Sequence, residues 1–96
     1  MYIRVTRNHV EPSRVDDALA LVPDTVAAMR RLPGCQHVHT GVDRTSGQGI
    51  SLIGITIFDT EEHARFSRDE ALTRAVSRLR ELGVSFEPPE VYAEVE

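Results

Sequence analysis

The sequence has little of what marks secreted, membrane-spanning or metal-rich proteins. Among its 96 residues there is one cysteine, Cys35, and no tryptophan. A single cysteine cannot form an internal disulfide, so nothing indicates an oxidising compartment, and a buried thiol is the simpler interpretation. Apolar runs of roughly eighteen residues are also missing, which argues against a membrane-spanning helix and against a membrane partner.

Signals for export, nucleic-acid binding and common enzyme classes are missing too. MYIRVTRNHV has no charged leader followed by an apolar segment, so we expect a cytoplasmic protein. Eleven basic and fifteen acidic side chains give a formal charge of -4, with both signs spread along the chain. Such a surface predicts no nucleic-acid partner. We find no glycine-rich phosphate loop and no nucleophile elbow, which argues against nucleotide-binding and hydrolase classes.

The length and the hydrophobic content predict one domain over residues 1–96. Hydrophobic residues make up 41% of the chain, which is enough for one core but not for two. A chain this short leaves much apolar surface uncovered, and pairing with a second copy would hide it. A homodimer is therefore expected already from size.

The periodicity of apolar residues predicts the order βαββαβ. Residues 2–8 alternate as a strand, and residues 15–31 show the three- and four-residue spacing of an amphipathic helix. Pro23 lies inside that helix, so we expect a kink or two helical pieces. The remaining elements are strands over 35–42, 50–58 and 91–95, a polar turn over 43–49, and a second helical region that starts at 60 and restarts near 68.

This order is the ferredoxin-like arrangement of the α+β class, in which helices cover one face of an antiparallel sheet. Two capping arrangements are expected in the second helical region, Asp59 with Glu62 and Ser67 with Glu70. The strand over 50–58 is apolar on both faces, yet one helical layer covers one face only. We therefore expect a second subunit to pack on the other face of the sheet.

The stretch 32–64 resembles the central signature of the antibiotic biosynthesis monooxygenase family, a group of dimeric α/β barrels. The matching positions are Pro33-Gly34, Val42-Asp43-Arg44, Gly47 and Phe58-Asp59-Thr60-Glu61-Glu62. Over the rest of the chain the resemblance consists of the order of elements. It implies two sheets packed face to face across a two-fold axis, with one pocket per subunit between helices and sheet.

The resemblance also implies candidate chemistry. Well-understood members oxidise aromatic polyketide-like phenols with molecular oxygen, using no metal and no flavin, so no cofactor is expected. Such members carry an indole at the end of the third strand and an amide four residues earlier; the corresponding positions here are Phe58 and Gly54. Members that degrade haem use an asparagine on the first strand, to which Asn8 corresponds, and a histidine on the second helix, for which His63 is the candidate.

His37 and His39 are two residues apart on a predicted strand, so their Cα atoms lie about 6.5 Å apart on one face. Cys35 is expected on the same face, and the three side chains together could ligate zinc or iron. A nearby carboxylate is missing from that set, however, and a polar face that lines a pocket or its rim is the preferred interpretation. We therefore predict a ligand-binding role for both histidines and no metal site.

Three residues are candidates for acid–base or anion-stabilising roles, and each has a structural alternative. His63 lies in the first turn of the second helical region and could also be an ordinary surface histidine. Arg78 lies at the border of an apolar helix stripe and could also be exposed with a buried stem. Tyr92 could donate to a ligand carbonyl or pack at the dimer seam. The walls of a dry pocket are predicted to be Phe58, Phe66, Leu72 and Val76, which could equally be core residues.

These features support three functions. The first is a cofactor-independent monooxygenase that acts on a planar phenol or quinol, with Arg78 or a histidine stabilising the phenolate. The second is a non-catalytic or regulatory dimer that binds a small molecule, favoured by the missing indole and amide. The third, haem degradation, rests on Asn8 and His63.

Overall fold

The computed structural model describes residues 1–44 and 49–95 and has the predicted order of elements. The predicted hairpin turn, with Gly47, falls mostly on residues 45–48, which lie outside the described residues. Along the chain the elements are β1 (Tyr2–Val10), a 3-10 turn η1 (Pro12–Arg14), α1 (Val15–Arg30), β2 (Cys35–Asp43), β3 (Ile50–Phe58), α2 (Glu61–Phe66), α3 (Glu70–Glu81), β4 (Ser85–Phe86) and β5 (Glu90–Ala93).

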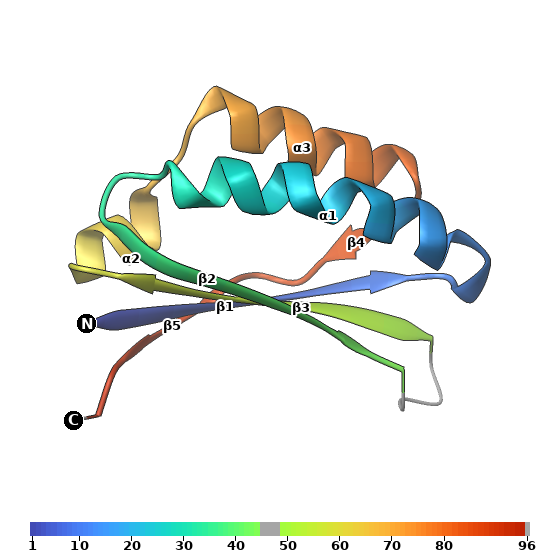
Figure 1. The fold of residues 1–96 in the computed structure, drawn as a ribbon. Coiled ribbons are helices and arrows are strands. Elements are labelled where there is room, and N and C mark those ends of the chain that lie inside the picture. Colours follow the sequence, from blue (N-terminus) through green and yellow to red (C-terminus); the bar gives the residue numbers. More distant parts are fainter. Residues whose placement is uncertain (45–48, 96) are drawn as a thin grey trace.

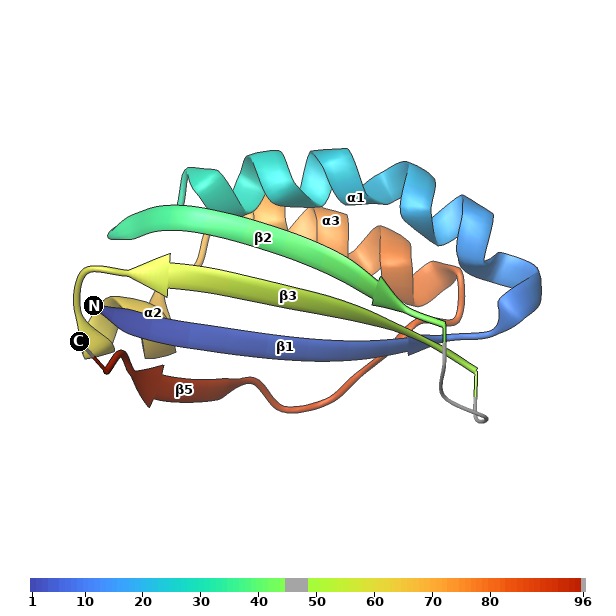
Figure 2. The same cartoon turned by 60° about the horizontal axis from the view of Figure 1, so that its bottom comes forward.

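The strands form one antiparallel sheet in which β3 and β1 are central (Figure 2). β1 runs against β3 in register from Tyr2 opposite Phe58 to Val10 opposite Ile50, and β2 pairs with the other edge of β3. β4 and β5 pair with different ends of β1. Pro88-Pro89 separates them, because a proline has no amide to donate to a strand ladder. The predicted closing strand is thus preceded by a short additional strand.

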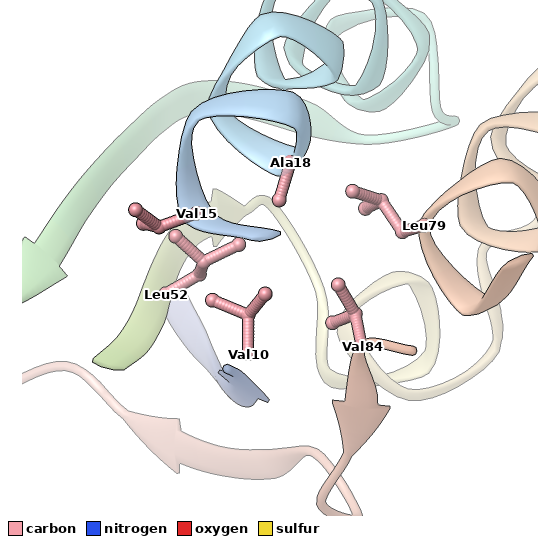
Figure 3. Packing of buried hydrophobic residues seen from close by; sticks show 6 residues of the cluster. All are labelled: Val10, Val15, Ala18, Leu52, Leu79 and Val84. Atoms are coloured by element: carbon pink, nitrogen blue, oxygen red, sulfur yellow. The ribbon is translucent and has the colours of Figure 1, made fainter. Parts of the chain in front are cut away.

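The helices α1 and α3 lie side by side over one face of this sheet (Figure 1). Successive strand residues point to opposite faces, so the even-numbered residues of β1 and β3 face the helices. They contribute to two clusters. The first core cluster holds Val10, Val15, Ala18, Leu52, Leu79 and Val84, which converge from sheet and helices (Figure 3). The second core cluster holds Leu32, Phe58 and Ala64.

α1 runs unbroken through Pro23, so the expected division into two helical pieces is wrong. Pro23 removes one amide donor, but it is exposed, and buried residues on both sides of it hold the helix on the sheet. Burial of an apolar face outweighs the loss of one hydrogen bond. Within the described part of the chain, no helix is long and apolar enough to cross a membrane.

The second helical region divides into α2 and α3 as predicted, but other residues cap the two helices. The Thr60 side chain accepts from the His63 amide at 3.1 Å, and the Asp69 side chain accepts from the Leu72 amide at 2.7 Å. Asp59 instead accepts from the His63 ring. The expected caps at Asp59 and Ser67 were each placed too early, and sequence reasoning commonly misses helix ends by this much.

The face of the sheet opposite the helices carries a row of isoleucine and valine residues that we call the open face. It consists of Ile3 and Val5 from β1 and Ile53, Ile55 and Ile57 from β3. Ile3 pairs with Ile57 and Val5 with Ile55, whereas Ile53 pairs with Arg7. Ile55 is 38% exposed. In the part of the chain that the structure describes, both long helices lie on the other side (Figure 1). The apolar two-sidedness of β3 predicted this arrangement.

Phe58 is the largest residue of the second core cluster, and its substitution tests how much this cluster contributes to stability. Its side chain is fully buried, and the Arg4 guanidinium lies 4.7 Å from its ring centroid. We expect Phe58→Ala to lower the free energy of unfolding by about 3–5 kcal/mol in urea titrations, because it removes a large buried side chain and leaves a cavity. Phe66→Ala is the matched control: Phe66 is 68% exposed, so a change within about 0.5 kcal/mol is expected. Equal losses in the two variants would contradict this core.

Candidate functional site

A pocket of about 120 Å³ lies between α1 and the sheet, and we call it the β1–α1 pocket. Its walls combine residues of three strands with the apolar face of α1 and one residue of α3. The strands contribute Thr6, Asn8, Thr40, Gly41, Val42, Leu52, Ile53 and Gly54, and the helices contribute Leu19, Val22, Thr25, Val26, Met29 and Leu79. This composition, mostly apolar with a few polar groups, is typical of small-molecule pockets, while the volume lies below the roughly 300–1,000 Å³ that such pockets have.

Asn8 is the polar group that distinguishes this pocket. Its position on β1, opposite Leu52, places it on the helix-facing side of the sheet. Its side-chain oxygen Oδ1 is buried and has no hydrogen-bond partner among the residues that the structure describes. A buried acceptor without a donor costs about 1–3 kcal/mol, so native proteins rarely keep one without a use. Asn8 Oδ1 is therefore an acceptor available to a ligand that brings a hydroxyl or an N–H group.

The absence of a side chain at Gly54 shapes the floor of the pocket. Gly54 pairs with Thr6 on β1 and with Thr40 on β2. A Cβ atom at Gly54 would lie 2.5 Å from Thr6 Oγ1, which is too close for atoms that are not bonded. Glycine thus lets the Thr6 hydroxyl lean over the strand into the space that a side chain would take. The floor consequently presents hydroxyl groups and backbone.

The lining of the β1–α1 pocket is uncharged. Arg4 is two residues from Thr6 on the same face, but its guanidinium lies over Phe58 and donates to the Ala64 carbonyl at 3.2 Å. Burial lowers the pKa of Arg4, which has no acidic side chain as a partner in the described residues. Arg4 therefore contacts the second core cluster and not the pocket. The pocket can bind a neutral molecule, but it offers no positive charge to a phenolate or a carboxylate.

Among the predicted site residues, Asn8 alone is part of this pocket's lining. Phe58 is enclosed in the second core cluster, and Leu72 packs against that cluster. Phe66 is largely exposed on α2, and Val76 is half-buried on α3. The aromatic residues around the end of β3 therefore form a core and a surface, and the hollow lies beneath the middle of α1, between the two core clusters.

The three candidates for acid–base roles lie apart from one another. His63 Nδ1 donates to Asp59 Oδ1 at 2.6 Å on the surface of α2, and this hydrogen bond lowers the pKa of Asp59. Arg78 is exposed on α3 and pairs with Asp24 of α1 at 3.4 Å. Tyr92 lies on β5 with its hydroxyl donating to Glu90, which raises the pKa of the phenol. Their predicted catalytic roles stay untested, but the structure does not gather them around one ligand.

His37 and His39 share one face of β2, as predicted, and their ring centroids are 6.4 Å apart. That face is the open face, since they pair with Ile57 and Ile55. The prediction that Cys35 shares it is wrong. A register irregularity between Cys35 and His37 places Cys35 opposite Phe58, where it packs against the second core cluster. Burial raises the pKa of this thiol. In the residues described, no group of three possible ligands gathers for a metal ion.

Sequence reasoning missed most of the pocket, including Thr6, Thr40 and the face of α1. The signal for Thr6 was present, because Thr6 and Asn8 share the helix-facing register of β1. The hollow itself has no such signal. It depends on the volume that remains between the strand residues and the α1 side chains, which a single sequence does not reveal.

Comparison with protein-family models finds no match, and comparison with curated proteins finds none either. Solved structures do match over the whole chain. SnoaB, a cofactor-independent oxygenase from Streptomyces nogalater, is 17% identical, with 99% of this chain and 93% of that chain covered and a TM-score of 0.69. A structure described as an antibiotic biosynthesis monooxygenase is 18% identical over 100% of both chains, with a TM-score of 0.71.

A conserved protein from Methanosarcina mazei Go1 is 18% identical, with 99% of this chain and 94% of that chain covered and a TM-score of 0.72. At these identities the likeness shows the fold. The resemblance noted in the sequence is thereby confirmed at the level of the fold, which is the ferredoxin-like α+β fold of the antibiotic biosynthesis monooxygenases.

The unpartnered oxygen of Asn8 predicts an unusual stability effect. Asn8→Leu replaces the amide with an apolar group of similar size, so we expect the free energy of unfolding without ligand to rise by about 1 kcal/mol. Urea titration measures this change. Asn8→Asp is the matched control, and it should lower stability because it places a charge against apolar walls. A loss of stability in Asn8→Leu would mean that Oδ1 already has a partner in solution.

Proposed function

We propose, from the premise that the chain has the antibiotic biosynthesis monooxygenase fold, that it is a cofactor-independent monooxygenase acting on a planar aromatic phenol or quinol. The β1–α1 pocket would hold the ring. The observation that carries this proposal is the buried acceptor Asn8 Oδ1 in an otherwise mostly apolar, uncharged site. SnoaB, of the same fold, is a cofactor-independent oxygenase.

In this proposal the walls of α1 contact the faces of the ring and exclude water. A ligand hydroxyl donates to Asn8 Oδ1, which orients the ring and increases its electron density. An anthrone-type phenol that gains one oxygen atom and loses two hydrogens releases water, so the substrate supplies all four electrons that oxygen accepts. The pocket residues therefore bind and orient, while the substrate itself reduces oxygen.

The uncharged lining favours a second candidate, a small-molecule-binding or regulatory dimer without catalysis. Neither an acid, a base nor a cation is among the lining residues. A binder is stabilised by ligands that it leaves unchanged, so thermal shift combined with product analysis separates the two functions. Haem degradation has less support, because His63 is hydrogen-bonded to Asp59 on α2 and does not line the pocket.

The proposed activity is tested by following oxygen uptake with anthrone-type phenols and the purified protein. We expect uptake above the buffer rate, and we expect Asn8→Leu to lower kcat/KM by about tenfold or more, since one buried hydrogen bond to the ligand is lost. Arg65→Gln, at an exposed arginine of α2 outside the pocket, serves as the control and should leave the rate unchanged. Uptake no faster than in buffer across a broad panel of phenols would refute the enzyme.

We further propose that the functional unit is a homodimer that pairs through the open face. The face presents isoleucine and valine side chains from both central strands, with His37 and His39 along the β2 side and Tyr92 on β5. A second copy brings an identical apolar surface, as a two-fold interface requires. Burial of these side chains contributes roughly 25 cal/mol for each Å² removed from water.

The dimer is tested by light scattering after size exclusion. We expect the native chain to have the mass of two copies, and Ile55→Lys to shift it to one copy, since a lysine would be forced into the apolar interface. Phe66→Lys is the control for the loss of an exposed apolar side chain elsewhere, and it should leave the mass unchanged. A monomeric native chain at micromolar concentration would refute the proposed interface.

A further inference from the structure

A second hollow, with a volume of about 140 Å³, lies between α1 and α3. Its floor consists of alanines that let the two helices approach, and Ala28 and Ala75 are each 4% exposed. Its rim consists of exposed charged side chains: Asp24 from α1, Arg31 just after the end of α1, and Arg74 and Arg78 from α3. We call this hollow the arginine groove. Its volume is far above the roughly 10–15 Å³ that a single buried water needs.

The charge of the arginine groove is opposite to that of the chain. Three guanidinium groups and one carboxylate line it, whereas the whole protein has a formal charge of -4. The positive charges come from two helices and converge on one hollow. A local positive field of this kind raises the concentration of anions at the site.

The guanidinium groups have only weak partners within the protein. Arg78 pairs with Asp24 at 3.4 Å, and Arg74 pairs with Glu70 at 3.8 Å, where the Glu70 side chain is 94% exposed. Arg31 has no ion pair with any described residue. Exposed pairs of this length contribute little to stability and exchange readily for a stronger partner. The groove therefore holds unused capacity for charge-assisted hydrogen bonds.

We infer that the arginine groove binds a small phosphate-bearing ligand, with Arg31, Arg74 and Arg78 as its donors. A guanidinium presents parallel N–H groups that match the spacing of phosphate oxygens, and several such groups around one hollow neutralise a multiply charged anion. Asp24 competes with that ligand for Arg78. A long polyanion such as nucleic acid fits less well, because its flanks would meet the acidic remainder of the surface.

This site is independent of the proposed oxygenase or binding function. None of the groove residues lines the β1–α1 pocket, which lies against the sheet-facing side of α1. A variant that loses phosphate binding should keep its oxygen uptake, and a variant that loses oxygen uptake should keep its phosphate binding.

The test is calorimetric titration of the full chain with inorganic pyrophosphate at constant ionic strength. We expect saturable binding that weakens about tenfold in Arg31→Gln, because one charge-assisted interaction is lost. Asp24→Asn should have the opposite effect and tighten binding severalfold, since it removes the competing carboxylate. A merely destabilising substitution would not produce a gain, and a gain of affinity therefore separates a direct role from misfolding.

Arg65→Gln provides the matched control, because Arg65 is a comparably exposed arginine that pairs with Glu61 on α2 and lies outside the groove. It should leave the Kd unchanged, and unaltered melting temperatures would show that all variants fold. The proposal is overturned if the native chain and Arg31→Gln bind pyrophosphate equally, if Asp24→Asn weakens binding, or if single-stranded RNA binds more tightly than pyrophosphate does.

Discussion

The architecture depends on one constraint. β3 has apolar side chains on both faces of the sheet, but the helices of the chain cover only one of these faces. Leu52 and Phe58 enter the two core clusters beneath the helices, whereas Ile53, Ile55 and Ile57 point to the other side. Alternation along a strand makes this unavoidable, since neither set can turn inward without exposing the other. The sheet therefore has one face packed by its own chain and one that only another surface can cover.

The same alternation decides where the β1–α1 pocket forms. Because the helix-facing residues of β1 change from Tyr2 and Arg4 at one end to Thr6 and Asn8 farther along, the interface with the helices is not uniform. The Arg4 end is filled by the ring of Phe58. Thr6 and Asn8 lie beneath the middle of α1, where the pocket forms and the Asn8 amide oxygen lacks a partner among the described residues, and Val10 beyond them enters the first core cluster. Core and pocket are two stretches of one interface.

How far the sequence predicts this structure follows from the range of each interaction. Element order and the bounds of β3 depend on periodicity along the chain, and both were predicted. The continuity of α1 through Pro23 and the caps at Thr60 and Asp69 depend on competition between neighbouring residues. The two predicted caps were each one or two residues too early, and the predicted division of α1 into two pieces does not occur. The predicted orientation of Cys35 was wrong because one register irregularity between Cys35 and His37 reverses the alternation of side chains.

The pocket was the least predictable feature, since it is the volume left unfilled between side chains of five separate elements. Aromatic residues near the end of β3 drew attention because rings can hold planar ligands, yet Phe58 is large enough to fill its surroundings completely. A hollow arises where side chains are small or missing, and Gly54 gives no apolar signal at all. In this sheet Phe58 therefore lies where the core is filled, and Gly54 and the buried side-chain amide of Asn8 lie where the pocket forms.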